Sequence, residues 1–334
     1  MDAAVGEPMG PVMSDRYRVA VVGAGAIGAR HVQAMARVTR RVDLDIVDPL
    51  PQARAGAASL LESAGGLRDG RLRMFDRLDR LDGAPDLAIV ATNARERPDA
   101  IRMLVSLNTP AMVLEKVLFT RLSDHDEFDR VLTDAGIRGW VNCPRGAYPR
   151  MARLRELIDR EPFEYRVEGQ GWGLGCNLIH HLHEFCSLSR EDDLQLDVSS
   201  LLPAIAPSRR PGYIEFFGRI GGRTAQGNAF EATCTDGPAG PRSVCILLAD
   251  RRLTLSAEQT LTIETRSGTR IEPYPIVRQS ELTAAYVQAI LGGGSPALPD
   301  YLSSSRLHRS MLGALVQHLR RIRHDPAIDE CPVT

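Results

Sequence analysis

The feature that most constrains the fold of this chain is a glycine-rich turn between an apolar segment and a helical pattern. The apolar segment, Arg18 to Val22, is typical of a buried parallel strand, and the helical pattern extends over residues 29–38. The turn reads Gly-Ala-Gly-Ala-Ile-Gly, a G-x-G-x-x-G motif between a strand and a helix, which is the context in which it binds a dinucleotide. The three glycines permit the tight turn, the approach of a pyrophosphate and the packing of helix on strand. The residues expected to contact a dinucleotide are Gly23, Gly25, Ala26, Ile27 and Gly28.

A carboxylate follows the next predicted strand, which covers residues 44–47. Asp48 stands about 20 residues beyond Gly28, at the distance where an acidic residue accepts hydrogen bonds from the adenosine ribose. A carboxylate in that position repels a 2′-phosphate. The sequence therefore predicts that NAD(H) is favoured over NADP(H).

Strands and helices continue to alternate up to residue 143. The segments typical of strands are residues 72–75, 86–92, 111–114 and 139–143, and those typical of helices are residues 98–107 and 123–135. This alternation predicts a parallel, doubly wound Rossmann sheet, whose ligands lie at the carboxyl ends of its strands. We therefore expect the residues that leave those ends, Thr92, Asn93, Glu115 and Lys116, to contribute to the cofactor site.

Lys116 is the only lysine in the chain; every other basic residue apart from histidine is an arginine. A position that retains lysine in such a sequence can require a compact ammonium group whose pKa is tunable, which arginine does not provide. The alternative is an ordinary surface lysine. Its place after a Rossmann strand, where a nicotinamide ring is expected, favours the functional interpretation.

After Pro144 the pattern changes to longer strands separated by turns rich in Gly and Pro. The predicted strands are residues 164–168, 194–198, 212–219, 230–235, 243–248, 254–256 and 260–265. The fold class is therefore α/β plus α+β, with an open, mainly antiparallel second sheet that has the helix 177–188 on one face. The predicted divisions are a disordered tail (1–15), a Rossmann domain (16–144), a substrate and oligomerisation domain (145–303), and a C-terminal helix packing back on the Rossmann domain with its tail (304–334).

Composition excludes several classes of protein. The formal net charge of −1 argues against a nucleic-acid binder, which needs a basic excess to pair with phosphates. No apolar run approaches the roughly 20 residues of a membrane-spanning helix, and the first residues do not read as a signal peptide. The six cysteines form no C-x-x-C pair, so we expect free thiols in a reducing, cytoplasmic compartment.

Three motifs together resemble the glucose–fructose oxidoreductase and inositol dehydrogenase (Gfo/Idh/MocA) family. The glycine motif is followed by His31, as is frequent in that family. Its Glu-Lys-Pro signature is matched by Glu115-Lys116-Val117, with valine in place of proline. Its Asp-x-Gly-x-His-x-x-Asp-like helix is matched by the segment from Asn177 to Glu184. The resemblance covers nearly the whole chain.

The resemblance implies roles for individual residues. Lys116 would contact the reacting oxygen of the substrate and the nicotinamide ribose, His181 would donate or accept the proton, and residue 177 would orient His181. Residues 177, 181 and 184 share one helical face. Asn177 can hydrogen-bond an imidazole but does not stabilise an imidazolium as a carboxylate does. Either Glu184 compensates, or Lys116 carries the proton alone.

Other residues near the domain junction are candidates for holding the substrate. Arg145 and Arg150 could bind a carboxylate, a phosphate or sugar hydroxyls together with Tyr148, and Trp172 could stack on a sugar ring. Each could equally have a structural or surface role. Cys176, His180 and Glu184 have a spacing that suits a metal, but no fourth ligand accompanies them, and we predict no metal site.

These observations predict an NAD(H)-dependent oxidoreductase that acts on a secondary alcohol or ketone of a sugar, nucleotide sugar or cyclitol. Its partner would be a small polyhydroxylated substrate, with no nucleic acid and no membrane. By the resemblance, copies would form a homodimer or homotetramer through the C-terminal sheet. The alternatives are an imine reductase on the same fold and a non-catalytic NAD-binding sensor or scaffold.

Overall fold

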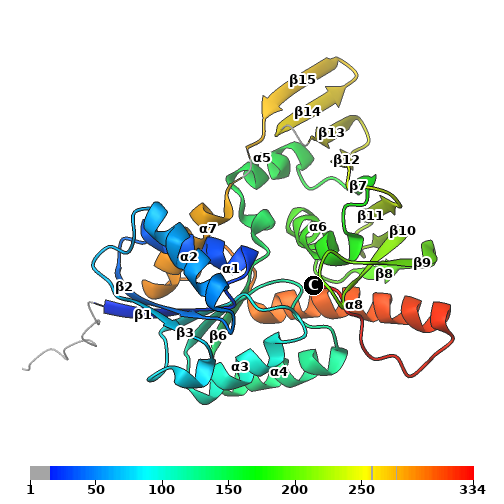
Figure 1. The fold of residues 1–334 in the computed structure, drawn as a ribbon. Helices are drawn as coiled ribbons and strands as arrows, with labels where there is room; N and C mark the ends of the chain where they lie inside the picture. The colour runs from blue at the N-terminus through cyan, green and yellow to red at the C-terminus, as the bar shows by residue number, and fades with distance from the viewer. Residues whose placement is uncertain (1–15, 257–258, 276) are drawn as a thin grey trace, which may run out of the picture.

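The computed structural model describes residues 16–256, 259–275 and 277–334, so the predicted N-terminal tail lies outside the described residues. The first half of the chain forms a parallel sheet of six strands in the order β3-β2-β1-β4-β5-β6 (Figure 1). The strands are β1 (Arg16–Val22), β2 (Arg41–Val47), β3 (Leu72–Phe75), β4 (Leu87–Val90), β5 (Ala111–Leu114) and β6 (Arg138–Val141). The helices are α1 (Ala26–Ala34), α2 (Pro51–Ser63), α3 (Arg97–Ser106) and α4 (Leu122–Asp134). The predicted doubly wound Rossmann sheet is confirmed.

The second sheet has nine strands in the order β15-β14-β13-β12-β7-β11-β10-β8, with β9 paired to β10. They are β7 (Glu164–Gln170), β8 (Gln195–Asp197), β9 (Leu201–Pro207), β10 (Ile214–Arg223), β11 (Ala229–Thr235), β12 (Arg242–Leu247), β13 (Arg251–Leu255), β14 (Thr260–Thr265) and β15 (Gly268–Pro273). All described pairings are antiparallel except that of β7 with β11. The mainly antiparallel sheet is therefore confirmed.

The helices of the second half are α5 (Pro149–Ile158), α6 (Leu174–Ser189), α7 (Gln279–Leu291) and α8 (Tyr301–Arg323). Helix α6 packs on one face of the second sheet, and α7 packs on α1. Helix α8 contacts β6 and α4 of the first half and α6 and β8 of the second, which joins the two sheets through one hydrophobic core (Figure 1). It begins at Tyr301, before the predicted residue 304, because the carboxylate of Asp300 accepts a hydrogen bond from Ser303 N at 2.9 Å.

Alternation along the strands decides which residues of the second sheet face α6. Tyr165 and Val167 of β7 are buried beneath the helix, as are Phe230 and Ala232 of β11. The opposite face is polar, with ion pairs such as Arg219 to Glu231 at 3.1 Å. One face of this sheet therefore belongs to the core, and the register of the strands is specified by it.

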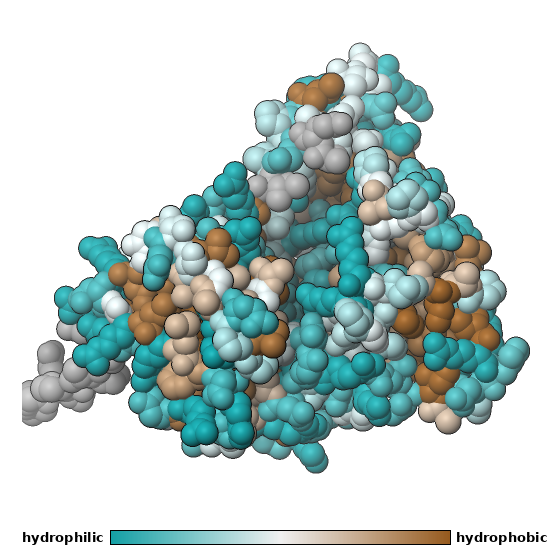
Figure 2. Space-filling view, in the orientation of Figure 1, coloured by the Kyte–Doolittle hydropathy of each residue, from teal (hydrophilic) through white to brown (hydrophobic). Residues whose placement is uncertain are grey.

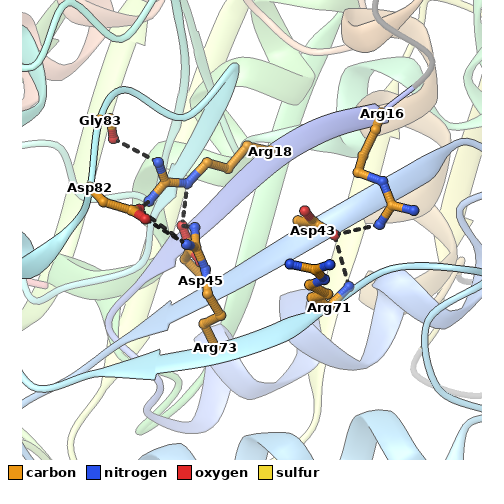
Figure 3. Close-up of polar contacts among 8 residues, drawn as sticks. All are labelled: Arg16, Arg18, Asp43, Asp45, Arg71, Arg73, Asp82 and Gly83. Carbon is orange, nitrogen blue, oxygen red and sulfur yellow. Dashed lines mark hydrogen bonds and ion pairs between the residues drawn. The ribbon is translucent and has the colours of Figure 1, made fainter.

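A cluster of ion pairs around a buried carboxylate joins three strands at one edge of the first sheet (Figure 3). The carboxylate of Asp45, which is fully buried, lies 2.6 Å from Nε of Arg18 and 2.8 Å from Nε of Arg73. Asp82 contacts both arginines from the other side, at 2.7 and 3.0 Å. A buried carboxylate is tolerated only when it is paired in this way, so the contacts link β1, β2 and β3.

Three elements were not expected from the sequence. Helix α2 follows Asp48, strand β9 contains Pro203 and Pro207, and β15 is polar and mostly exposed. The last two are strands at or near an edge, where a polar or proline-containing sequence is compatible with pairing on one side. Among the described residues, no helix is long and apolar enough to span a membrane.

Candidate functional site

A cleft of about 1080 Å³ lies between the two sheets. On one side it is lined by residues that follow β4, β5 and β6, and on the other by α6 and by strands β10 and β12. Figure 2 shows the surface hollowed between the two parts of the molecule, with hydrophilic side chains around the hollow. The carboxyl ends of the Rossmann strands therefore face the second sheet across this cleft.

The glycine motif has the geometry that a pyrophosphate requires. Gly23 has φ of +89°, and a Cβ on Gly28 would lie 1.8 Å from the carbonyl oxygen of Gly23. A Cβ on Gly25, by contrast, would meet no atom of a described residue within 4 Å. Helix α1 begins at Ala26 with no side-chain cap, so the backbone N–H groups of its first turn, including that of Ile27, remain available to an anion.

Asp48 is held in position by the backbone of this same turn. Its Oδ2 accepts a hydrogen bond from Ala24 N at 2.7 Å and its Oδ1 accepts one from Leu50 N at 2.9 Å. Arg54 in the first turn of α2 donates to the carbonyl oxygen of Asp48. A carboxylate has lone pairs left after two such bonds, so Asp48 can still accept a ribose hydroxyl.

Thr92 and Asn93 follow β4 at the edge of the cleft. The hydroxyl oxygen of Thr92 is buried and has no hydrogen-bond partner among the described residues, which suits a bound cofactor that supplies one. The side-chain oxygen of Asn93 accepts a hydrogen bond from Arg210 at 2.7 Å. Asn93 therefore contacts a loop of the second half of the chain.

Glu115 lies at the wall of the cleft, where it belongs to a buried network of hydrogen bonds. Its Oε1 lies 2.9 Å from Nε2 of His31 and accepts a hydrogen bond from the side chain of Asn142. Burial alone would raise the pKa of Glu115, but the hydrogen bonds and the charge of His31 outweigh it, and the pKa is lowered. The Nδ1 of His31 contacts Thr283 of α7 at 2.8 Å. The network fixes the segment that presents Lys116.

Lys116 reaches across the cleft to the first turn of helix α6. Its Nζ donates to the carbonyl oxygen of Cys176 at 3.1 Å and lies 3.3 Å from the sulfur of the same residue. The peptide bond that follows Lys116 is cis. The structure thus brings together the lysine after β5 and the helix that carries His181.

His181 is fully buried and has three polar neighbours. Its Nδ1 lies 2.8 Å from the hydroxyl of Tyr165, and that hydroxyl donates to Glu184 at 2.9 Å. One guanidinium nitrogen of Arg145 lies 3.1 Å from Nε2 of His181 and 3.3 Å from its Nδ1. The O–H of Tyr165 donates its hydrogen bond to Glu184, so the phenol oxygen can only accept from Nδ1 of His181. Arg145 can only donate, so Nδ1 carries the proton and Nε2 is the acceptor. Burial and the charge of Arg145 hold the pKa of His181 well below its usual range.

Asn177 does not orient His181 as the resemblance implied. Its side-chain nitrogen donates to the carbonyl oxygens of Trp172 and Gly173, at 2.8 and 3.2 Å. An amide satisfied by the backbone at the start of α6 supports the helix terminus instead. The residue that hydrogen-bonds the imidazole is Tyr165, which the sequence did not single out.

The four candidate substrate residues, Arg145, Tyr148, Arg150 and Trp172, all line the cleft, but the ring faces of the two aromatic residues are partly covered by arginines. The indole nitrogen of Trp172 donates to the carbonyl oxygen of Thr233 at 2.8 Å, and the guanidinium of Arg242 lies 5.4 Å from the centre of its ring. The guanidinium of Arg150 lies 4.6 Å from the centre of the Tyr148 ring. The aromatic faces therefore hold arginines in the cleft.

Three residues of this site were missed by sequence reasoning, namely Tyr165, Glu215 and Arg242. Glu215 accepts a hydrogen bond from Gly175 N at 2.8 Å and so caps the start of α6; burial raises its pKa. All three lie on strands of the second sheet, and only the pairing of those strands brings Glu215 and Arg242 to the cleft and Tyr165 to His181. Among the described residues, no group of three or more His, Cys, Asp or Glu side chains could hold a metal ion.

Comparison with known proteins identifies relatives of both the sequence and the fold. Residues 17–143 match the model of a family described as "Oxidoreductase family, NAD-binding Rossmann fold" (GFO_IDH_MocA). No curated protein matches the sequence. Solved structures with the same overall fold include oxidoreductases of three bacteria.

UDP-N-acetylglucosamine 3-dehydrogenase GnnA of Acidithiobacillus ferrooxidans is 15% identical, with a TM-score of 0.65 over 89% of this chain and 96% of that one. KijD10, a 3-ketoreductase of Actinomadura kijaniata in complex with NADP, is 17% identical, with a TM-score of 0.67 over 90% and 96%. An oxidoreductase of Agrobacterium radiobacter in complex with NAD+, L-tartaric acid and magnesium is 15% identical, with a TM-score of 0.65 over 90% and 94%. At these identities the likeness shows the fold, and the neighbours' cofactors include both NAD+ and NADP.

Proposed function

We propose, from the premise that this chain is an oxidoreductase of the Gfo/Idh/MocA family, that it transfers a hydride between NAD(H) and a secondary alcohol or ketone of a polyhydroxylated substrate. A sugar, nucleotide sugar or cyclitol is the substrate class that we favour. The neighbours of similar fold that are a nucleotide-sugar 3-dehydrogenase and a 3-ketoreductase support this class. Bound NAD(H) would supply the acceptor or donor of the hydride.

The observation that carries the proposal is the contact between Lys116 and the first turn of α6. Nζ of Lys116 lies 3.1 Å from the carbonyl oxygen of Cys176, in the cleft that the end of β5 shares with His181. An ammonium group there is well situated to stabilise negative charge on the reacting oxygen of an alcohol or ketone. Retention of the chain's single lysine at this point argues against a purely structural role.

His181 is suited to accept the proton of an alcohol. Its lowered pKa keeps the imidazole neutral near pH 7, with the lone pair on Nε2. Nδ1 hydrogen-bonds to Tyr165, and Tyr165 hydrogen-bonds to Glu184. These two hydrogen bonds would stabilise the imidazolium that forms, because they link it to the carboxylate of Glu184. Glu184 thus supplies, through Tyr165, the carboxylate that Asn177 lacks.

The fit of the nucleotide supports NAD(H) rather than NADP(H). Gly25 leaves room for a pyrophosphate at the start of α1, and Thr92 offers an unpaired hydroxyl at the end of β4. Asp48, oriented by Ala24 N and Leu50 N, would accept the adenosine ribose hydroxyls and repel a 2′-phosphate.

Association of copies through the second sheet stays a prediction. The face of this sheet opposite α6 carries ion pairs such as Arg166 with Glu164, so an interface there would be polar. Analytical ultracentrifugation at low and high salt tests it. A dimer or tetramer that dissociates at high salt is the expected result, because exposed ion pairs are screened.

The first test is the oxidation of a panel of sugars, UDP-sugars and inositols with NAD+, followed by the absorbance of NADH. In a variant with Lys116→Ala, we expect turnover to fall by about 100- to 1000-fold and NAD+ affinity to change little, since one charge-stabilising donor contributes on that scale. Lys116→Arg, which keeps the charge, should retain more activity than Lys116→Ala. Turnover that survives Lys116→Ala would overturn the assignment.

A further inference from the structure

The cations of the cleft differ from those on the surface in their lack of carboxylate partners. Surface arginines such as Arg102 and Arg121 each lie within 3.1 Å of two carboxylates. In the cleft, by contrast, no carboxylate of a described residue lies within 4.0 Å of Lys116 or Arg242, and Arg145 has only Glu184, at 3.7 Å. This side of the cleft therefore carries a positive charge that its own residues do not neutralise.

The register of the second sheet directs Arg242 toward helix α6. Arg242 of β12 is paired with Gly169 of β7, which lies on the same face as Tyr165. The guanidinium of Arg242 lies 5.4 Å from the centre of the Trp172 ring, and that ring meets His181 edge-on at 5.6 Å. Arg242 thus borders the group of residues that surrounds His181.

Arg145 approaches the same point from the segment after β6. Its side chain is 19% exposed, and one of its terminal nitrogens contacts Nε2 of His181 at 3.1 Å. A guanidinium has five N–H donors, and the other terminal nitrogen of Arg145 makes no hydrogen bond to a described residue. The guanidinium of Arg242 makes none to a described residue either. Two forks of donors are therefore available beside the imidazole.

Two like charges held together in a largely buried place are unfavourable without an anion. The pKa of Arg242 is lowered, first by burial and next by the charge of Arg145, so the two guanidinium groups oppose each other. His180, which lines the same wall, has a buried Nδ1 with no hydrogen-bond partner among the described residues. An oxyanion at this point would offset the repulsion and could accept hydrogen bonds from all three residues.

We propose that Arg145 and Arg242 bind an oxyanion group of the substrate, a carboxylate or a phosphate, beside the carbon that reacts. The proposal rests on the proposed function and narrows its substrate class to polyhydroxylated acids and phosphates. When Arg145 turns its donors to this anion, it leaves Nε2 of His181. That nitrogen is then free to take the proton of the substrate hydroxyl, while the carbon that bears this hydroxyl would give its hydride to NAD+.

The test compares neutral sugars with their acids. Glucose with glucuronate and galactose with galacturonate form matched pairs, and glucose 6-phosphate distinguishes a phosphate from a carboxylate. We expect the acid or phosphate to have a kcat/KM at least about tenfold above that of its neutral partner, as a charge-assisted hydrogen bond provides. Arg242→Gln should lower the value for the charged substrate by about 10- to 100-fold, and Arg242→Lys should restore part of it.

The matched control is Arg102→Gln on helix α3, where the guanidinium is exposed outside the cleft and pairs with Glu127, and it should change nothing. Thermal unfolding with NADH and glucuronate gives a readout besides activity, in which glucuronate should raise the Tm of the wild type but not of Arg242→Gln. Equal use of glucose and glucuronate, or an unaffected Arg242→Gln, overturns the anion site and leaves the dehydrogenase intact. A glucuronate-dependent Tm shift that requires Arg242, with no oxidation of any sugar, supports the anion site and contradicts the redox proposal instead.

Discussion

The phenol oxygen of Tyr165 lies 2.8 Å from Nδ1 of His181 and so ties the first strand of the second sheet to the helix that covers it. Both residues are fully buried, and burial together with Glu184 holds the pKa of Tyr165 well above its usual range. The phenol therefore keeps its proton. It donates a hydrogen bond to Glu184 and accepts a hydrogen bond from Nδ1 of His181. This arrangement fixes the tautomer that leaves Nε2 able to act as a base.

Replacing Tyr165 by phenylalanine tests this arrangement. Tyr165→Phe leaves the buried carboxylate of Glu184 without its donor and the imidazole without its partner, so we expect kcat to fall by about 10- to 100-fold, on the scale of 1–3 kcal/mol for a lost charged hydrogen bond. NAD+ affinity, measured by thermal shift, should not change. Tyr17→Phe on β1, which makes the same deletion far from the cleft, should leave kcat intact. An unchanged kcat in Tyr165→Phe would mean that Lys116 carries the proton without this chain of residues.

The difference between Tyr165 and Asn177 illustrates how far the sequence leads. The end of a predicted strand was sufficient to place Lys116 at the cofactor site, whereas His181 and Glu184 were singled out by the family resemblance, with their spacing on one helical face in support. Tyr165 could not be recognised as their partner. It lies on a strand that pairs in parallel with β11 and antiparallel to β12, and only that pairing turns its side chain toward α6.

The same reason explains what was missed in the fold. All six Rossmann strands were predicted, and β4 and β5 are continuous apolar segments, since both faces of such a sheet are covered by helices. Strands β9 and β15 lie at or near the edge of their sheet and have no such pattern, so tertiary pairing alone reveals them. Arg242 begins a strand that was predicted, but its role depends on Trp172 and Arg145, which come from other elements.

Nucleotide preference is expected to depend on Asp48. In Asp48→Ser the carboxylate that repels a 2′-phosphate is gone, and Arg54, which lies against the backbone of residue 48, becomes available to pair with that phosphate. We expect the ratio of Kd values for NADP+ and NAD+ to shift toward NADP+ by about tenfold or more, as 1.4 kcal/mol gives. Thermal shifts with NAD+, NADH, NADP+ and NADPH measure this preference. Asp43→Ser, on the strand β2 that precedes Asp48, also removes one carboxylate and should leave the ratio unchanged. Equal affinity of the wild type for both nucleotides would contradict the role of Asp48.

The glycine motif offers two alanine substitutions, of which only one is expected to lower stability. A Cβ on Gly28 would lie 1.8 Å from the carbonyl oxygen of Gly23, so Gly28→Ala must displace helix α1 and should lower the Tm and NAD+ affinity together. A Cβ on Gly25 would meet no atom of a described residue within 4 Å, so Gly25→Ala should keep the Tm and still weaken NAD+ binding, because the methyl group occupies the space of the pyrophosphate. Thermal unfolding with and without NAD+ separates the two. Unweakened binding in Gly25→Ala would show that the pyrophosphate lies elsewhere.

The stability of the protein should depend steeply on pH because it buries several neutral histidines. Burial lowers the pKa of His125 to about 3 and that of His183 to about 4, and it holds those of His180, His181 and His308 well below their usual range. A histidine whose folded pKa is depressed binds its proton only after unfolding. Its contribution to stability is therefore complete above the unfolded pKa of about 6.5 and is lost as the pH falls from there toward the folded value.

We accordingly expect the free energy of unfolding, measured in urea at pH 7, 6 and 5, to fall with decreasing pH by up to about 1.4 kcal/mol per pH unit for each such histidine. The variant His125→Gln removes one of these groups, whose ring packs edge-on against Phe119 with 4.9 Å between ring centres and whose Nδ1 contacts Ser305 at 2.8 Å. It should be less stable than the wild type at pH 7. Its free energy of unfolding should fall less steeply with decreasing pH, because about one proton fewer is taken up on unfolding. His324→Gln, at an exposed position after α8, should leave the slope unchanged. A wild-type stability that is flat between pH 7 and pH 5 would mean that these side chains are already protonated in the folded protein, and the neutral state of His181 on which the proton transfer depends would fail with them.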